Sequence, residues 1–134
     1  MTKIAFLMDP IETVAIKKDS TLAMIRAAQI RGMEPYYCRQ EDLVIAAQSV
    51  CAYLRPLSLV EHFAKALDPA SVNNGDDPWF TLGSAELMPL SHMDIVMMRK
   101  DPPFDMEYIY TTYLLERAET EGVRVVNRPG SLRD

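Results

Sequence analysis

The chain has 134 residues, of which 49% are apolar and 25% charged, and its formal net charge is −5. This length is typical of one domain with its own hydrophobic core, and no apolar run approaches the roughly 20 residues that a membrane helix needs. The negative charge and the lack of a basic stripe with interleaved aromatic residues argue against nucleic acid as a partner. The sequence therefore predicts one domain over residues 1–134 that binds neither nucleic acid nor membrane.

The first residues carry no targeting signal. One lysine, a short apolar stretch and then Asp9-Pro10 lack the length and the cleavage site of a signal peptide, so we expect a cytoplasmic protein. Cys38 and Cys51 form no C-x-x-C pair, and neither histidine stands at metal-ligand spacing to them. We expect reduced cysteines that serve in packing, and no metal site.

The beginning of the chain is typical of a strand, a helix and a second strand. Lys3 to Met8 contains a continuous apolar run, as in a strand buried on both faces of a parallel sheet. Residues 21–31 are rich in helix formers, and Gly32 is placed to end the helix. Glu34 to Cys38 then predicts the second strand. This order is that of a βαβ unit, whose crossover is right-handed in nearly all known cases.

The middle of the chain has weaker signals. Leu43 to Ala47 and Val50 to Leu54 can pair as a hairpin, although no Gly or Asn between them supplies the positive φ that tight two-residue turns prefer. Residues 73–78, which read NNGDDP, predict a loop. Trp79 and Phe80 follow it, and we expect them to anchor the loop onto the body of the domain.

The last third returns to strand, helix and strand. Asp94 to Arg99 predicts a strand, and Val123 to Asn127 predicts another. Between them, the predicted helix has an apolar side at helical spacing, formed by Met106, Tyr110, Tyr113, Leu114 and Ala118, with Gly122 placed just beyond its end. The whole pattern predicts an α/β fold: an open, mostly parallel sheet with helices on both faces and a hairpin elaboration in the middle.

Three predicted strands end in the same way, with polar residues stopped by a proline at Pro10, Pro102 and Pro129. Ligands of parallel α/β sheets lie outside the carboxyl ends of the strands, where loops and helix N-termini converge. Cations and carboxylates mix in these loops, which suits a ligand with both a carboxylate and an ammonium group, such as an amino acid or a peptide. The candidate binding residues at this edge are Lys17, Lys18, Asp19, Ser20, Arg99, Lys100, Asp101 and Asn127. The structural alternative for each is a helix cap or a solvated surface charge.

Catalytic and phosphate-binding motifs are missing from the sequence. The turn after the first predicted strand has no glycine, so it is neither G-x-G-x-x-G nor a P-loop, and no serine stands in G-x-S-x-G. ATP or a dinucleotide has no evident seat. The residues by themselves predict a substrate-binding half without catalytic residues of its own.

Several sequence words nevertheless resemble one family. They are MDPI at 8–11, IKKDST at 16–21, MRKDPPFD at 98–105, YIYTTYLLERA at 108–118 and VNRPGSLRD at 126–134. In this order they are similar to the amino-terminal part of prokaryotic glutathione synthases, whereas residues 40–92 resemble it only loosely. The resemblance implies a Rossmann-like pre-ATP-grasp domain whose ATP-grasp portion is absent from this chain.

The resemblance also implies a reaction and its participants. In such enzymes ATP and magnesium convert the cysteinyl carboxylate of γ-glutamylcysteine to an acyl phosphate, which the amine of glycine attacks to give glutathione, ADP and phosphate. ATP and Mg²⁺ would be bound by the ATP-grasp portion, and the whole enzyme would be a homo-oligomer. By position, Lys17, Lys18, Asp19, Ser20, Arg99, Lys100 and Asp101 would form the wall of the substrate cleft nearest this domain.

Two other interpretations stay open at the level of sequence. One is a non-catalytic α/β module for dimerisation or small-ligand binding. The other is the same domain in a different ATP-grasp amino acid ligase, because a fold alone fixes no substrate.

Overall fold

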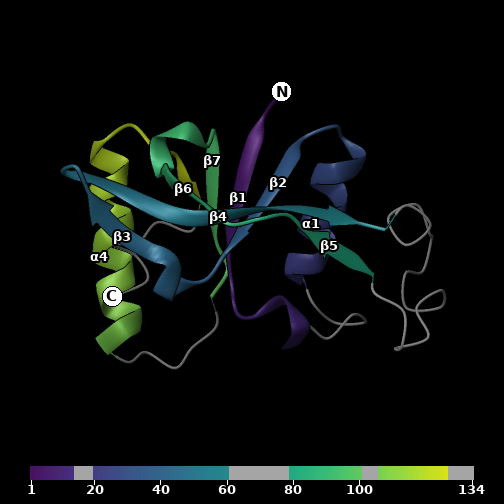
Figure 1. Ribbon diagram of the computed structural model, residues 1–134, viewed down its shortest axis with the longest axis horizontal. Helices are drawn as coiled ribbons and strands as arrows, with labels where there is room; N and C mark the ends of the chain where they lie inside the picture. Colours follow the sequence, from purple (N-terminus) through teal and green to yellow (C-terminus); the bar gives the residue numbers. More distant parts are fainter. Residues whose placement is uncertain (14–19, 61–78, 101–105, 127–134) are drawn as a thin grey trace.

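The computed structural model describes residues 1–13, 20–60, 79–100 and 106–126, which form one mixed β-sheet with helices packed against it (Figure 1). The helices are α1 (Ser20–Ile30) and α4 (Met106–Thr120), with short 3₁₀ turns η1 (Ile11–Thr13), η2 (Gln40–Asp42) and η3 (Leu90–His92). The strands are β1 (Lys3–Leu7), β2 (Glu34–Cys38), β3 (Leu43–Ala46), β4 (Ser49–Leu59), β5 (Phe80–Leu82), β6 (Glu86–Pro89), β7 (Ile95–Met98) and β8 (Val125–Val126).

Four strands form a parallel half in the order β2, β1, β7, β8. The predicted bounds of β2 are confirmed, those of β1 differ by one residue at one end, those of α1 and β7 differ by one residue at both ends, and β8 begins two residues later than predicted. Both helices are followed by the predicted glycine in the left-handed region, Gly32 at φ 81° and Gly122 at φ 94°, a conformation that costs glycine little.

The other strands form an antiparallel half around β4. The long β4 pairs with β3 and β6 through its first part and with β2 and β5 through its later part. In Figure 1 it extends along the molecule from α4 toward α1. The prediction of a mostly parallel sheet is therefore wrong: the sheet is mixed, because β4 continues well beyond the expected hairpin.

The predicted hairpin is confirmed as β3 and β4, and its turn lies at Ala47 and Gln48. Both residues have positive φ, 51° and 69°, as a tight two-residue turn requires even though neither is Gly or Asn. Side chains of α4 and of the residue that follows it hold this hairpin in place. Arg117 donates to the carbonyl of Gln48 at 2.8 Å, and the carboxylate of Glu121 accepts the amide N–H of Val50 at 3.0 Å.

The core lies on both faces of the sheet, because the side chains of a strand alternate between its faces. Ala5 and Leu7 of β1 belong to a cluster that includes α4, whereas Ile4 and Phe6 belong to a second cluster that includes α1. Helices on both faces of the sheet are thus confirmed.

The apolar side predicted for α4 is only partly correct. Leu114 and Ala118 are buried, but Met106, Tyr110 and Tyr113 are 79%, 60% and 56% exposed. The buried side instead includes Thr111 and Thr112. Their hydroxyls donate to backbone carbonyls of the same helix, at Glu107 and Ile109, so both side chains can be buried with satisfied hydrogen bonds.

Candidate functional site

The carboxyl ends of β1 and β7 lie next to each other and bring opposite charges together. The backbone N–H of Arg99 donates to the carbonyl of Leu7 at 2.8 Å, which aligns the two strand ends. Immediately beyond them, Lys100 Nζ lies 2.8 Å from Asp9 Oδ1, and the two side chains are 15% and 31% exposed. We refer to the border where β1 and β7 end, with Asp9, Arg99 and Lys100, as the carboxyl edge of the sheet.

The first turn of α1 reaches the same place. The Nε–H of Arg99 donates to the hydroxyl of Thr21 at 3.2 Å, and Thr21 is buried in that turn. The Arg99 guanidinium therefore lies near the N-terminus of α1. The next residue in the chain, Lys100, forms the ion pair with Asp9. Two cations held at one border can orient a carboxylate by charge-assisted hydrogen bonds.

The structure places two of the eight predicted site residues, Arg99 and Lys100, and brings them together at the carboxyl edge. Ser20 begins α1, but its side chain lies outside the described residues. The remaining five also lie outside them: Lys17, Lys18, Asp19, Asp101 and Asn127. Their position at this edge stays a prediction.

A polar cavity lies beside the carboxyl edge, at the carboxyl end of β2, and we refer to it as the arginine cavity. Its volume is about 290 Å³, and its lining consists of Glu12, Tyr37, Arg39, Asp42, Tyr53, Arg55 and Ala85. None of these residues was a sequence candidate. The sequence holds no local signal for them, because the pairing of β2 with β4 is what sets Tyr37 opposite Arg55.

Tyr37 and Cys38 are the two described groups at this end of β2 whose pKa values are shifted. Burial raises the pKa of the Tyr37 phenol, and the N–H of Ile11, which donates to its oxygen at 3.2 Å, opposes the shift. Burial also raises the pKa of the Cys38 thiol, and the nearby carboxylate of Asp42 adds to it. Both groups stay protonated at neutral pH, so Cys38 is a packing residue, as predicted, rather than a nucleophile.

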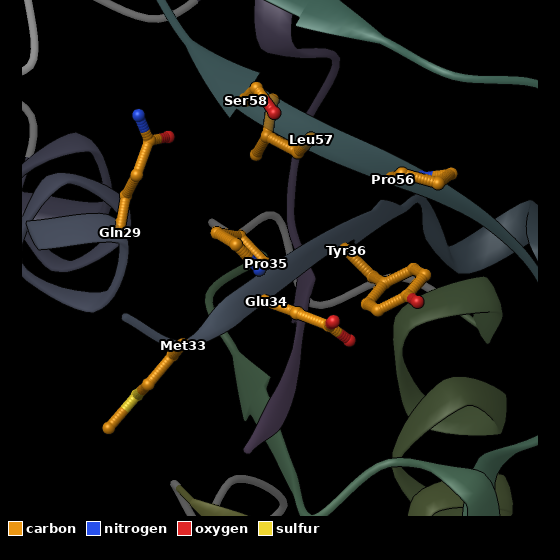
Figure 2. A pocket seen from close by; sticks show the side chains of 8 residues that line it. All are labelled: Gln29, Met33, Glu34, Pro35, Tyr36, Pro56, Leu57 and Ser58. Atoms are coloured by element: carbon orange, nitrogen blue, oxygen red, sulfur yellow. The ribbon is translucent and has the colours of Figure 1, made fainter. Parts of the chain in front are cut away.

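A larger cavity, about 420 Å³, lies toward the amino end of β2, where β2 and β4 diverge (Figure 2). Pro35 and Pro56 stand in its lining, and neither has an N–H to donate. Gln29 reaches in from α1, and its amide is already engaged. It donates to the carbonyl of Leu59 at 3.0 Å and accepts the N–H of Leu59 at 2.7 Å. Glu34 is the one charged residue of the lining, so this cavity offers less to a polar ligand than the arginine cavity.

The described residues do not fit a metal ion or a membrane span. Within residues 1–13, 20–60, 79–100 and 106–126, no three His, Cys, Asp or Glu side chains gather as metal ligands. No helix in these ranges is long and apolar enough to cross a membrane.

Fold and edge together define an α/β domain with charged side chains gathered where its parallel strands end. Residues 2–133 match the family described as prokaryotic glutathione synthetase, N-terminal domain. The chain is 49% identical over 132 residues to the glutathione synthetase of Pseudomonas putida, and 47% identical over 134 residues to that of Shewanella oneidensis. These alignments cover 98% and 100% of this chain and 38% of each relative.

A third relative, the glutathione synthetase of Nitrosomonas europaea, is 47% identical over 132 residues, which are 98% of this chain and 38% of the relative. The chain therefore belongs to the prokaryotic glutathione synthetase N-terminal domain family, as its sequence words predict. It spans somewhat more than a third of the length of these curated relatives.

Proposed function

We propose that this chain is the amino-terminal, substrate-side domain of a glutathione synthase. The whole protein would join the cysteinyl carboxylate of γ-glutamylcysteine to the amine of glycine. The γ-phosphoryl group of ATP passes to the carboxylate, the amine attacks the acyl carbon and loses a proton, and phosphate leaves. The observation that carries the proposal is the match of residues 2–133 to a family found in whole glutathione synthetases.

ATP and Mg²⁺ belong, in this proposal, to the part of the protein that lies outside the matched span. The described residues offer no cluster of carboxylates for a metal ion. In this proposal the catalytic residues of the ligation likewise belong to the part of the protein outside the matched span.

The role of this domain is to bind and orient substrate at the carboxyl edge. Arg99 and Lys100 are held there by Thr21 and Asp9, which fixes their positions before substrate arrives. A fixed cation loses little conformational entropy when it binds a carboxylate. We propose that Lys17, Lys18, Asp19, Ser20, Asp101 and Asn127 complete this side of the substrate cleft.

A chimera tests the activity. This chain replaces the corresponding 132 residues of the Pseudomonas putida glutathione synthetase, and ADP release is measured with γ-glutamylcysteine and glycine. We expect turnover that requires both substrates. A chimera that unfolds as cooperatively as its parent but releases no ADP would contradict the proposal. Turnover with another amine, but not with glycine, would favour a different amino acid ligase.

The edge itself is tested in an active chimera with Lys100→Met. We expect the KM for γ-glutamylcysteine to rise about 10-fold or more, because a hydrogen bond between charged groups is worth roughly 1.5–3 kcal/mol. Lys3→Met is the matched control, since Lys3 begins β1 and so lies at the opposite border of the sheet. An equal effect of both variants would show that Lys100 acts only through general electrostatics.

Assembly is a second candidate function, favoured by the exposed stripe of Met106, Tyr110 and Tyr113 on α4. Aromatic residues and methionine are enriched at protein interfaces. Sedimentation of the 134-residue chain and of Tyr110→Lys tests it: a dimer that dissociates in the variant supports a homo-oligomer formed through α4. A monomer in both would remove this candidate.

A further inference from the structure

The arginine cavity is built by the pairing of β2 with β4. Tyr37 and Arg55 are direct partners across the two strands, and Tyr53 lies two residues before Arg55, on the same face of the sheet. Glu12 enters from η1, which is fastened to the cavity because the N–H of Ile11 donates to the Tyr37 hydroxyl at 3.2 Å. Secondary structure, rather than loops alone, positions its polar groups.

Arg55 and Tyr37 keep N–H and O–H groups that can donate hydrogen bonds to a ligand in this cavity. Arg55 donates from Nε to the carbonyl of Gly83 at 2.8 Å, and among the described residues this is the single hydrogen bond of its guanidinium. Its two terminal nitrogens therefore keep their N–H groups. The phenol of Tyr37 accepts from Ile11 and stays protonated, so its own O–H remains a donor. A guanidinium and a phenol on paired strands can both donate hydrogen bonds to one carboxylate.

Acceptors lie in the same cavity. One carboxylate oxygen of Asp42 accepts the backbone N–H of Arg39 at 2.8 Å, so the other oxygen can accept a hydrogen bond from a ligand. Within the described part of the chain, the carboxylate of Glu12 takes part in no hydrogen bond or ion pair. Arg39 is drawn toward Glu41, which is not in the lining, at 3.2 Å. The cavity thus holds a cation and an anion that do not neutralise each other.

We propose that the arginine cavity binds the α-amino acid group of a small ligand, with its carboxylate on Arg55 and Tyr37 and its ammonium group toward Glu12 and Asp42. A volume of about 290 Å³ lies at the lower end of the range of small-molecule sites, which suits an amino acid or the end of a short peptide. This site goes beyond the proposed ligase function, because it would bind ligand whether or not the whole protein is a ligase.

Titration of the 134-residue chain, followed by ¹H–¹⁵N NMR, tests the site. The probes are glycine, L-glutamate and γ-glutamylcysteine, with acetate and methylammonium carrying one charge each. We expect shifts at Tyr37, Tyr53 and Arg55, with a dissociation constant on the order of millimolar. Either single-charge probe should bind more weakly than glycine. Preference for γ-glutamylcysteine over both free amino acids identifies a peptide end as the ligand, and the reverse identifies a free amino acid.

Three variants separate binding from folding. Arg55→Gln should lower the affinity for glycine about 10- to 100-fold, because it removes a charge-assisted hydrogen bond. Tyr37→Phe should lower the affinity for glycine by a smaller factor, and it provides the test of the site if Arg55→Gln fails to fold. Glu12→Gln, at an exposed position, should lower the affinity for glycine toward that for acetate, with Asp42 still facing the ammonium group, and should not weaken acetate binding. The matched controls are Arg124→Gln and Glu107→Gln, both exposed and outside the cavity.

The proposal is overturned if none of the amino acid probes shifts the cavity residues, which would mean that the cavity holds water alone. It is also overturned if the shifts persist in Arg55→Gln and Tyr37→Phe, or if the control variants weaken binding equally. The ligase proposal is judged separately, because its chimera is read by ADP release and not by binding to this chain.

Discussion

The parallel and antiparallel halves of the sheet differ in what holds them together. In the parallel half, β1 is buried on both faces and each neighbouring strand pairs with it or with β7. In the antiparallel half, every pairing involves β4, and the side chains of Glu121 and Gln29 accept backbone N–H groups of that strand. The comparison teaches that both halves rest on apolar burial, while β4 is held in addition by particular polar side chains.

The largest effect should come from removing a core side chain of β4. Leu54 is fully buried, so Leu54→Ala should lower the free energy of unfolding by about 2–5 kcal/mol. Urea unfolding is followed by Trp79 fluorescence, which reports on the antiparallel half, and by helical circular dichroism. We expect both transitions to shift together, as in one cooperative domain. A shift of the fluorescence transition alone would show that the halves unfold separately; Leu7→Ala in β1 is the matched core variant.

The next largest effect should come from Gln29, which joins α1 to β4. Gln29→Ala leaves the N–H and the carbonyl of Leu59 without their partner, at a cost of about 1–3 kcal/mol. Gln29→Glu keeps an acceptor for the N–H but loses the donor, so its effect should be smaller. Exchange of the Leu59 amide, measured by NMR, should be faster in the alanine variant. Unchanged exchange would mean that another group holds the end of β4.

The hairpin turn should respond in the opposite direction. Ala47→Asn combined with Gln48→Gly places preferred residues at the two positive-φ positions and should stabilise the domain by about 1 kcal/mol. Ala46→Gly, on the adjacent residue of β3, is the control. It should destabilise, because glycine in a strand has more freedom to lose. Thermal unfolding measures both variants, and a loss of stability in the double variant would contradict the role given to the turn.

The smallest effect is expected at the carboxyl edge. Asp9→Asn removes one charge of the pair with Lys100, and because both side chains are partly exposed the cost should be below about 1 kcal/mol. Salt screens such a pair, so the difference from the unaltered chain should shrink in 0.5 M NaCl, at a Debye length of about 4 Å. A loss above 2 kcal/mol that salt does not change would make this pair part of the core of the fold.

Sequence reasoning predicted the parallel half well because its signals are local. The apolar run at 3–8 predicts a strand by itself, and Gly122 predicts the end of a helix by itself. It failed where the structure depends on distant partners. The strand β4 passes through Pro56, whose carbonyl accepts the N–H of Gly83, and nothing near Pro56 in the sequence announces that partner.

The candidate site divides in the same way. Polar residues after β1 and β7 predicted the carboxyl edge, since the ends of parallel strands meet, and Asp9, Arg99 and Lys100 do lie together there. Tyr37 and Arg55 could not be predicted to share a cavity, because the register between β2 and β4 links residues 18 positions apart.

That register ties binding chemistry to foldability. If β4 slid by one residue along β2, Arg55 would turn to the other side of the sheet, and Leu57 and Leu59 would leave the α1 cluster with it. The pairing that folds the sheet therefore also sets positions 37 and 55 side by side. A change at Glu12 or Tyr53 can alter what the proposed site binds without disturbing that pairing.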